Sequence, residues 1–175
     1  MRIVASFGAG PGAFTGLRVA CGVAQGLAVG AGLPVVPVCG LEAMALLAGE
    51  FRVLSLLDAR MGEVYAAAYE RRAGSLERQG EIRVGPPATL DLPAGGNWFA
   101  CGNALAAYPD LAGRLHAAGF PLVPEILPQA AAVARLAACR LANGAGSDPA
   151  LAAPLYVRDK VAKTIRERLD AGGKA

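Results

Sequence analysis

The sequence is poor in charged residues, in aromatic residues and in histidine. Charged side chains make up 18% of the 175 residues and aromatic ones 6%, whereas charged residues usually supply about a quarter of a soluble domain. The single histidine, His116, excludes the paired histidines of a metalloprotease and gives no basis for a Ser-His-Asp triad. We expect His116 at a helix end on the surface, and we expect no catalytic residues.

Cysteine is also scarce and scattered. Cys21, Cys39, Cys101 and Cys139 form no C-x-x-C pair, so the ligand cluster of a zinc site is missing. Buried free thiols in a reducing compartment are the simplest interpretation. We therefore expect a cytoplasmic protein with no metal and no cofactor.

Charge is absent altogether from the 23 residues Val19–Leu41, a length that could span a membrane. Gly32, Pro34 and Pro37 interrupt this run, which instead predicts a helix, a turn and a strand. The run also lies too far from a basic start to be a signal peptide. We expect no membrane association.

The net charge of +3 lies entirely in residues 155–175, which carry six basic and three acidic side chains. The remainder of the chain is neutral overall. A solvated basic tail is the simpler interpretation, and a contact between this tail and nucleic acid is the alternative.

Hydrophobic periodicity and turn signals predict a series of alternating strands and helices. The predicted strands are 2–7, 34–38, 53–58, 63–69, 81–84, 98–101 and 122–123, and the predicted helices are 14–30, 41–48, 103–116, 129–141 and one that begins at Asp159. The strand–helix–strand unit at the start predicts two parallel strands. The next three strands predict an antiparallel meander.

Three antiparallel strands followed by strand–helix–strand–helix is the pattern of one half of an actin-like, ribonuclease-H-like (ASKHA) α/β fold. Residues 51–143 match a complete second half. Residues 1–50 match a first half without its three-stranded opening, and 144–175 form a linker and the basic tail. The first sheet should therefore have unpaired edges, which is a physical liability.

The glycine-rich loop Gly8–Ala13 lies between the first predicted strand and helix. Such a loop either lets a backbone approach a phosphate or permits close packing. Gly8, Gly10 and Ala13 satisfy the permissive dinucleotide fingerprint, but no acidic residue ends the second strand and no lysine follows the glycines. A nucleotide-binding enzyme that uses this loop remains the alternative hypothesis.

Close packing is favoured by the helix that follows the loop. Gly22, Gly26 and Gly30 recur every four residues and share one helix face. Leu17, Val23 and Leu27 make the opposite face apolar as well. Each glycine costs about 1 kcal/mol of helix stability relative to alanine, and close backbone approach can offset that cost. A helix without a charged face predicts burial against a partner subunit.

Five segments resemble the TsaB family of tRNA threonylcarbamoyladenosine biosynthesis proteins. They are Gly10–Arg18, Gly22–Ala28, Pro34–Val38, Leu57–Tyr65 and Pro154–Arg158. The resemblance implies an actin-like fold related to the catalytic TsaD subunit. It also implies a non-catalytic partner that works with TsaD and the ATPase TsaE to place threonylcarbamoyl on the adenosine beside the anticodon. Family members usually begin with further strands, so we expect that an opening segment is missing here.

The resemblance further implies that subunits pair through the glycine-rich helix, as a heterodimer with TsaD and as a homodimer when the chain is alone. Contact with tRNA is then indirect, through the complex. The interface residues carried over by position are Phe14, Leu17, Arg18, Cys21 and Gln25, together with Gly22 and Gly26 from the spacing.

Four carboxylates lie at predicted turns or element ends: Asp58, Glu63, Asp110 and Asp148. Asp58 ends a predicted strand at a hairpin, where actin-like enzymes place a carboxylate that faces a phosphate or a metal. We expect Asp58 instead to pair with Arg60 or to cap the turn, and Glu63 to support the same hairpin. Asp110 and Asp148 are expected to be caps.

Overall fold

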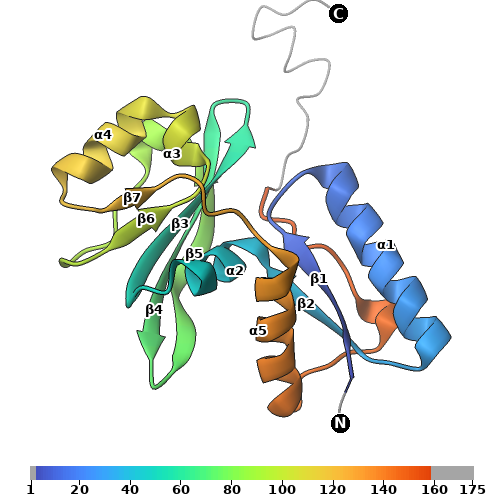
Figure 1. Cartoon of the computed structure of the whole chain (residues 1–175). Coiled ribbons are helices and arrows are strands. Elements are labelled where there is room, and N and C mark those ends of the chain that lie inside the picture. The colour runs from blue at the N-terminus through green and yellow to red at the C-terminus, as the bar shows by residue number, and fades with distance from the viewer. Residues whose placement is uncertain (1–2, 159–175) are drawn as a thin grey trace, which may run out of the picture.

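Two sheets with helices on both faces make up the computed structural model, which describes residues 3–158 (Figure 1). In the smaller sheet, β1 (Ala5–Gly10) and β2 (Val35–Cys39) are parallel and are joined by α1 (Phe14–Ala31). The predicted parallel unit is confirmed. Among the described residues, β1 pairs with β2 alone, so its other edge carries no strand.

Both faces of the small sheet are covered by helices, which explains why β2 carries three buried valines, Val35, Val36 and Val38, with only Pro37 exposed. Val35 packs with the buried side of α1, whereas Val36 and Val38 pack under α5 (Ala130–Ala142). Helices α1 and α5 therefore cover opposite faces of this sheet (Figure 1).

The larger sheet has the strand order β5-β4-β3-β6-β7. Its strands are β3 (Arg52–Arg60), β4 (Glu63–Arg72), β5 (Ser75–Gly85), β6 (Phe99–Cys101) and β7 (Leu122–Val123). The first three are antiparallel, and β6 and β7 run parallel to β3. This order confirms the predicted actin-like, ribonuclease-H-like class.

Helices supply a separate core on each face of the larger sheet. On one face, α2 (Gly40–Ala48) buries Leu41 and Met44. On the other, α3 (Ala104–Ala107) and α4 (Pro109–Ala117) bury Leu105 and Leu111. Two 3-10 turns, Pro87–Thr89 and Pro149–Leu151, complete the described elements.

Several boundaries differ from the prediction, and three of the differences have a clear physical reason. β1 runs through the glycines to Gly10, because Gly8 and Gly10 still pair with β2. The helix predicted over 103–116 is broken at Tyr108, since Pro109 has no N–H and disfavours helical geometry in the residue before it. β5 begins at Ser75 rather than at residue 81. The prediction missed residues 75–80 because this edge strand is polar and mostly exposed, and its sequence shows no alternation of apolar and polar residues.

Asp110 lies inside the first turn of α4 and caps nothing with its side chain, so its predicted capping role is wrong. Its negative charge still suits the amino end of a helix. Asp148 is a cap as predicted, because its carboxylate accepts from the backbone N–H of Ala150 at 2.8 Å. The helix predicted to begin at Asp159 lies outside the described residues.

The buried carboxylate of Glu70 gives the stability of the larger sheet a pH dependence. Hydrogen bonds from Arg72 and Arg52 hold the pKa of Glu70 below its ordinary value of 4.5. A lowered pKa stabilises the fold fully above that ordinary value, and the stabilisation is lost as the pH falls through the folded-state pKa.

We expect E70Q to lower the free energy of unfolding at neutral pH, because both guanidinium groups lose a charged acceptor. The difference from the wild type should shrink as the pH falls below about 4.5, measured as urea midpoints across a pH series. The control E81Q alters an exposed carboxylate that has no ion pair among residues 3–158, and it should leave the midpoint unchanged. A gap between E70Q and wild type that stayed constant with pH would contradict the assignment.

Candidate functional site

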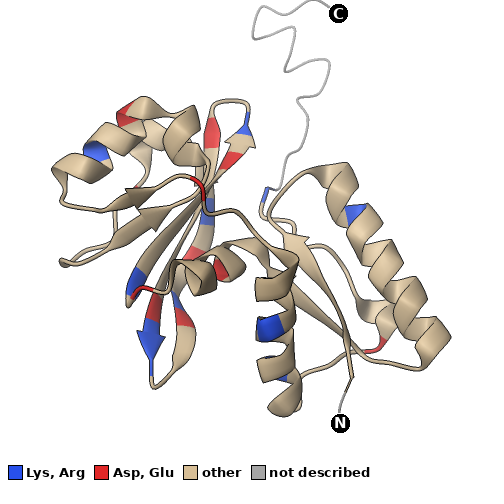
Figure 2. Cartoon of the chain, viewed as in Figure 1, with Lys and Arg blue, Asp and Glu red and all other residues tan. Residues whose placement is uncertain are grey.

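Exposed apolar side chains gather on the outward side of α1. Only Cys21, Ala24 and Ala28 of this helix are buried. The exposed large apolar side chains, which are 49% to 70% accessible, are Phe14, Val19, Val23, Leu27 and Val29. Arg18 is the only charged residue on the helix (Figure 2). Apolar surface of this extent marks an interaction site, and we call it the α1 face.

A row of glycines runs along the α1 face. Val23 and Leu27, which were expected on the opposite side of the helix, are exposed beside this row, because the buried side of α1 is formed by Cys21, Ala24 and Ala28. A Cβ atom built on Gly22, Gly26 or Gly30 would meet nothing within 4 Å. The close approach predicted from the four-residue spacing is therefore not made within residues 3–158. The row is an open furrow between apolar side chains, into which another backbone could fit.

Two of the residues predicted for the interface turn inward instead. Cys21 is buried and its thiol donates to the carbonyl of Ala152 at 3.3 Å. The Gln25 side-chain amide donates to the carbonyls of Pro149 and Ala152 at 2.9 and 3.3 Å. Cys21 and Gln25 thus hold the segment 149–152 beside the helix, where Leu151 is 76% exposed and extends the apolar surface.

The other predicted residues gather at the amino end of the helix. The Arg18 guanidinium lies 3.2 Å from the ring centre of Phe14 and 5.2 Å from that of Tyr156. Leu17 is half-buried over Gly10. Phe14, Arg18 and Tyr156 therefore form a cation–π stack at the edge of the α1 face.

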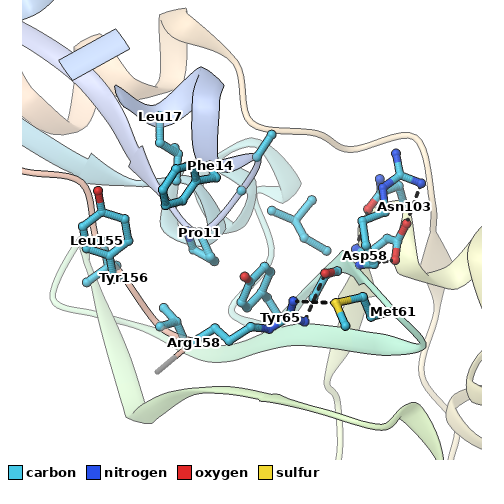
Figure 3. A pocket seen from close by; sticks show the side chains of 16 residues that line it. Pro11, Phe14, Leu17, Asp58, Met61, Tyr65, Asn103, Leu155, Tyr156 and Arg158 are labelled. Atoms are coloured by element: carbon cyan, nitrogen blue, oxygen red, sulfur yellow. Dashed lines mark hydrogen bonds and ion pairs between the residues drawn. The ribbon is translucent and has the colours of Figure 1, made fainter. Parts of the chain in front are cut away.

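Beside this stack lies a cavity of about 420 Å³ between the β1–α1 loop, the β3–β4 turn and residues 155–158 (Figure 3). Phe14, Leu17 and Leu155 line one side, and Asp58, Asn103 and Arg158 contribute polar groups. The cavity lies where the loop after the small sheet's β1 meets the β3–β4 turn of the larger sheet, and we call it the cleft.

The glycine loop at the cavity is occupied by the chain itself. A Cβ on Gly10 would lie 3.0 Å from the carbonyl oxygen of Leu155 and 3.1 Å from a methyl carbon of Leu17. The Leu155 N–H also donates to the Ala9 carbonyl at 2.7 Å. The close backbone approach that glycine permits at residue 10 is thus made by residue 155 of the same chain.

Asp58 is fully engaged at the same cavity. Its carboxylate accepts from the Arg60 N–H and from the Tyr108 hydroxyl, both at 2.8 Å, and pairs with the Arg60 guanidinium at 3.2 Å. The predicted turn cap and the pairing with Arg60 are confirmed. Burial first, and then the Asp58 carboxylate, raise the pKa of Tyr108, so this hydroxyl stays a donor.

Glu63 supports the β3–β4 hairpin, as predicted, and its ion-pair partner is Arg158, for which the sequence indicated no such role. Its carboxylate forms an ion pair with Arg158, and its carbonyl accepts from Tyr108 at 3.1 Å. Arg158 also donates to the Ala59 carbonyl at 3.1 Å. Tyr108, Asn103 and Arg158 thus fasten the hairpin to α3 and to the end of the described chain, and only Arg158 lay in a recognised sequence motif.

Residues 3–158 contain no group of three or more His, Cys, Asp or Glu side chains placed to hold a metal ion. His116 is exposed in the last turn of α4, as predicted. Cys21 and Cys101 are buried, and burial raises the pKa of the Cys101 thiol to about 11. The expectation that all four thiols are buried is wrong for Cys39, which is half-buried, and for Cys139, which is exposed on α5.

The uncharged run 19–41 is divided between α1 and β2, as expected. Within residues 3–158, one helix, Phe14–Ala31, is nevertheless long and apolar enough to cross a membrane by length and composition. Helix α1 packs its buried side against the small sheet, so its length and composition alone are weak evidence for a membrane span.

Comparison with known proteins identifies relatives over most of the chain. The family of TsaD, described as tRNA N6-adenosine threonylcarbamoyltransferase, matches residues 3–165. The tRNA threonylcarbamoyladenosine biosynthesis protein TsaB of Escherichia coli K12 is 36% identical over 165 residues, which cover 90% of this chain and 71% of that protein. TsaB of Haemophilus influenzae is 56% identical over 64 residues, or 34% of this chain and 27% of that protein.

Two solved structures from Pseudomonas aeruginosa are similar over the same region. YeaZ is 34% identical with a TM-score of 0.77, and the match covers 88% of this chain and 74% of that one. A protein described as similar to the peptidase YeaZ is 35% identical with a TM-score of 0.78, covering 89% and 73%.

Proposed function

Because the chain belongs to the family of TsaB and TsaD proteins, we propose that it is a non-catalytic subunit in tRNA threonylcarbamoyladenosine biosynthesis that pairs with a TsaD-type subunit through the α1 face. The single observation that carries this proposal is the open glycine furrow, flanked by exposed apolar side chains on a helix with one charge. The proposed interface includes Phe14, Arg18, Gly22 and Gly26, with Leu17, Cys21 and Gln25 in support behind it.

A helix is the partner element that this surface fits best. Side chains normally keep packed helices about 8–10 Å apart, and a row of glycines allows a closer approach. A partner of the same fold would present an equivalent helix. Two copies of this chain can also pair face to face about a twofold axis, which supports a homodimer in the absence of TsaD.

The non-catalytic assignment is supported by the state of the cleft. Asp58 already accepts from Tyr108 and Arg60, and the backbone of Leu155 lies against Gly10. We infer that the fold serves here as a scaffold in the cytoplasm, that the ATPase TsaE acts on the same complex, and that catalysis and the principal tRNA contacts belong to TsaD.

The proposal is tested by placing a charge on the α1 face. Leu27 is 66% exposed, so L27E should fold normally, whereas an unpaired carboxylate buried against a partner costs several kcal/mol. Sedimentation velocity of the chain mixed with TsaD should show at least about a 100-fold loss of affinity.

The matched control is L127E, because Leu127 is exposed to 43% and lies outside α1. It should associate with TsaD like the wild type. If L27E also associated normally, the α1 face would not be the interface. If the wild type bound vesicles rather than TsaD, the helix would be a membrane contact and the proposal would fail.

A further inference from the structure

A second surface feature lies away from the α1 face, between α2, α5 and the β4–β5 hairpin (Figure 1). It is a groove of about 700 Å³. Leu46, Leu76 and Leu136 contribute apolar lining, and Arg71, Arg135 and Arg140 contribute guanidinium groups. We call it the arginine groove. It is separate from the cleft and from α1, which covers the opposite face of the small sheet.

The strand register places a further arginine on the same side of the sheet. Tyr69 packs against α2 and pairs directly with Arg78 of β5, and Arg71 pairs with Leu76. Directly opposed residues of antiparallel strands share a face, so Arg71 and Arg78 both lie on the α2 side. Helix α5 adds Arg135 and Arg140 from across the groove (Figure 2).

Acidic side chains do not balance this charge. Glu42 is the only acidic residue that lines the groove, and it forms an ion pair with Arg140. Glu70 pairs instead with Arg52 and Arg72. Arg71 and Arg135 have no ion-pair partner among residues 3–158.

Positive charge is concentrated at the arginine groove, although the chain before the basic tail is balanced as a whole. Residues 1–154 contain eleven arginines and eleven acidic residues and are neutral overall. Three of those arginines line the groove, Arg78 lies on the same side of the sheet, and Glu42 is the one acidic residue in the lining. Arginine is also the cation suited to phosphate, because its planar group donates two parallel hydrogen bonds.

We propose that the arginine groove binds the phosphate backbone of RNA, with Arg71 and Arg135 as the principal phosphate contacts. This inference rests on the proposed function: if the chain works in tRNA modification, the groove would give it a direct contact with the tRNA. Guanidinium groups from separate elements suit a ligand with regularly spaced charges, and the leucines provide an apolar surface for a ribose or a base.

The first test measures binding of a tRNA transcript to the full-length chain by fluorescence anisotropy across a salt series. R71A and R135A should each weaken binding roughly five- to tenfold and lower the salt dependence by about one ion. The matched control R83A removes an exposed arginine that pairs with Asp91 and does not line the groove. All variants carry the same basic tail, so their differences cannot arise from it. An equal effect of R83A would overturn the proposal.

The second test places the RNA in the groove. Cys139 is exposed and lines the groove, whereas Cys21 and Cys101 are buried. Saturating tRNA should slow alkylation of Cys139 by a maleimide at least about fivefold. Unchanged alkylation would overturn the proposal, and equal protection by polyglutamate at the same charge concentration would show that the groove takes acidic peptides instead.

The two proposals fail separately. R71A and R135A should still associate with TsaD in sedimentation, because α5 and α1 lie on opposite faces of the small sheet. Loss of RNA binding with intact association therefore bears on the groove alone. Loss of association in L27E with intact RNA binding bears on the α1 face alone.

Discussion

Replacing Gly26 with leucine is expected to abolish association with TsaD while leaving the chain as stable as the wild type, or more so. A Cβ at this position meets nothing within 4 Å, so the isolated fold has room for the side chain. Leucine also favours a helix by up to about 1 kcal/mol over glycine. At the proposed interface, the same side chain fills the furrow and holds the partner helix away.

This combination distinguishes an interface from a structural role. Thermal unfolding should give a melting temperature equal to or above that of the wild type, and sedimentation with TsaD should show at least about a 100-fold loss of affinity. G22L should behave in the same way. G113L is the matched control, because Gly113 lies in α4 and is equally unobstructed. Normal binding of TsaD by both G22L and G26L would refute the assignment.

Replacing Gly102 with alanine is expected to remove a large part of the stability of the chain. A Cβ there would lie 2.0 Å from the carbonyl oxygen of Leu56 and 2.5 Å from the terminal carbon of Met44. The backbone φ of +117° is also one that residues with a side chain rarely adopt. Strain and overpacking together should cost about 3–5 kcal/mol, out of a typical total of 5–15 kcal/mol.

The cost at Gly102 arises because β6 ends against β3 at this residue. Its N–H donates to Val123 at 3.1 Å, and the next residue, Asn103, accepts from the N–H of Asp58 at 2.9 Å. The control G119A has a positive φ of 83° but meets nothing within 4 Å, so it should cost only about 1 kcal/mol of backbone strain. Urea denaturation compares the two, and similar midpoints for G102A and G119A would refute the packing argument.

The glycines show which features the sequence could predict and which it could not. The four-residue spacing of Gly22, Gly26 and Gly30 correctly gave one helix face, because helical periodicity is a local property. Spacing could not show whether that face was covered. The same composition in the loop gave no hint that Gly10 is packed against residue 155, since that contact joins distant parts of the chain.

The residues of the cleft show the same limit. Asp58 and Arg60 are two residues apart, so a turn cap was predictable from the sequence. Tyr108 and Arg158 reach the hairpin over sequence separations of 50 and 95 residues. Likewise, Cys21 and Gln25 matched a family pattern, but only the packing of residues 149–152 shows that they face inward.

By itself, the sequence determined the order of strands and helices, the actin-like class and the family, because hydrophobic periodicity, turn residues and local motifs are written in short stretches of chain. Tertiary structure alone decided which apolar and charged surfaces stay open. The furrow on α1 and the arginine groove both depend on what the rest of the fold leaves uncovered. Burial is a property of the whole chain. The glycines suggested close packing from their spacing, and the proposal that they bind a partner depends on the fold, in which nothing within residues 3–158 fills the space beside them.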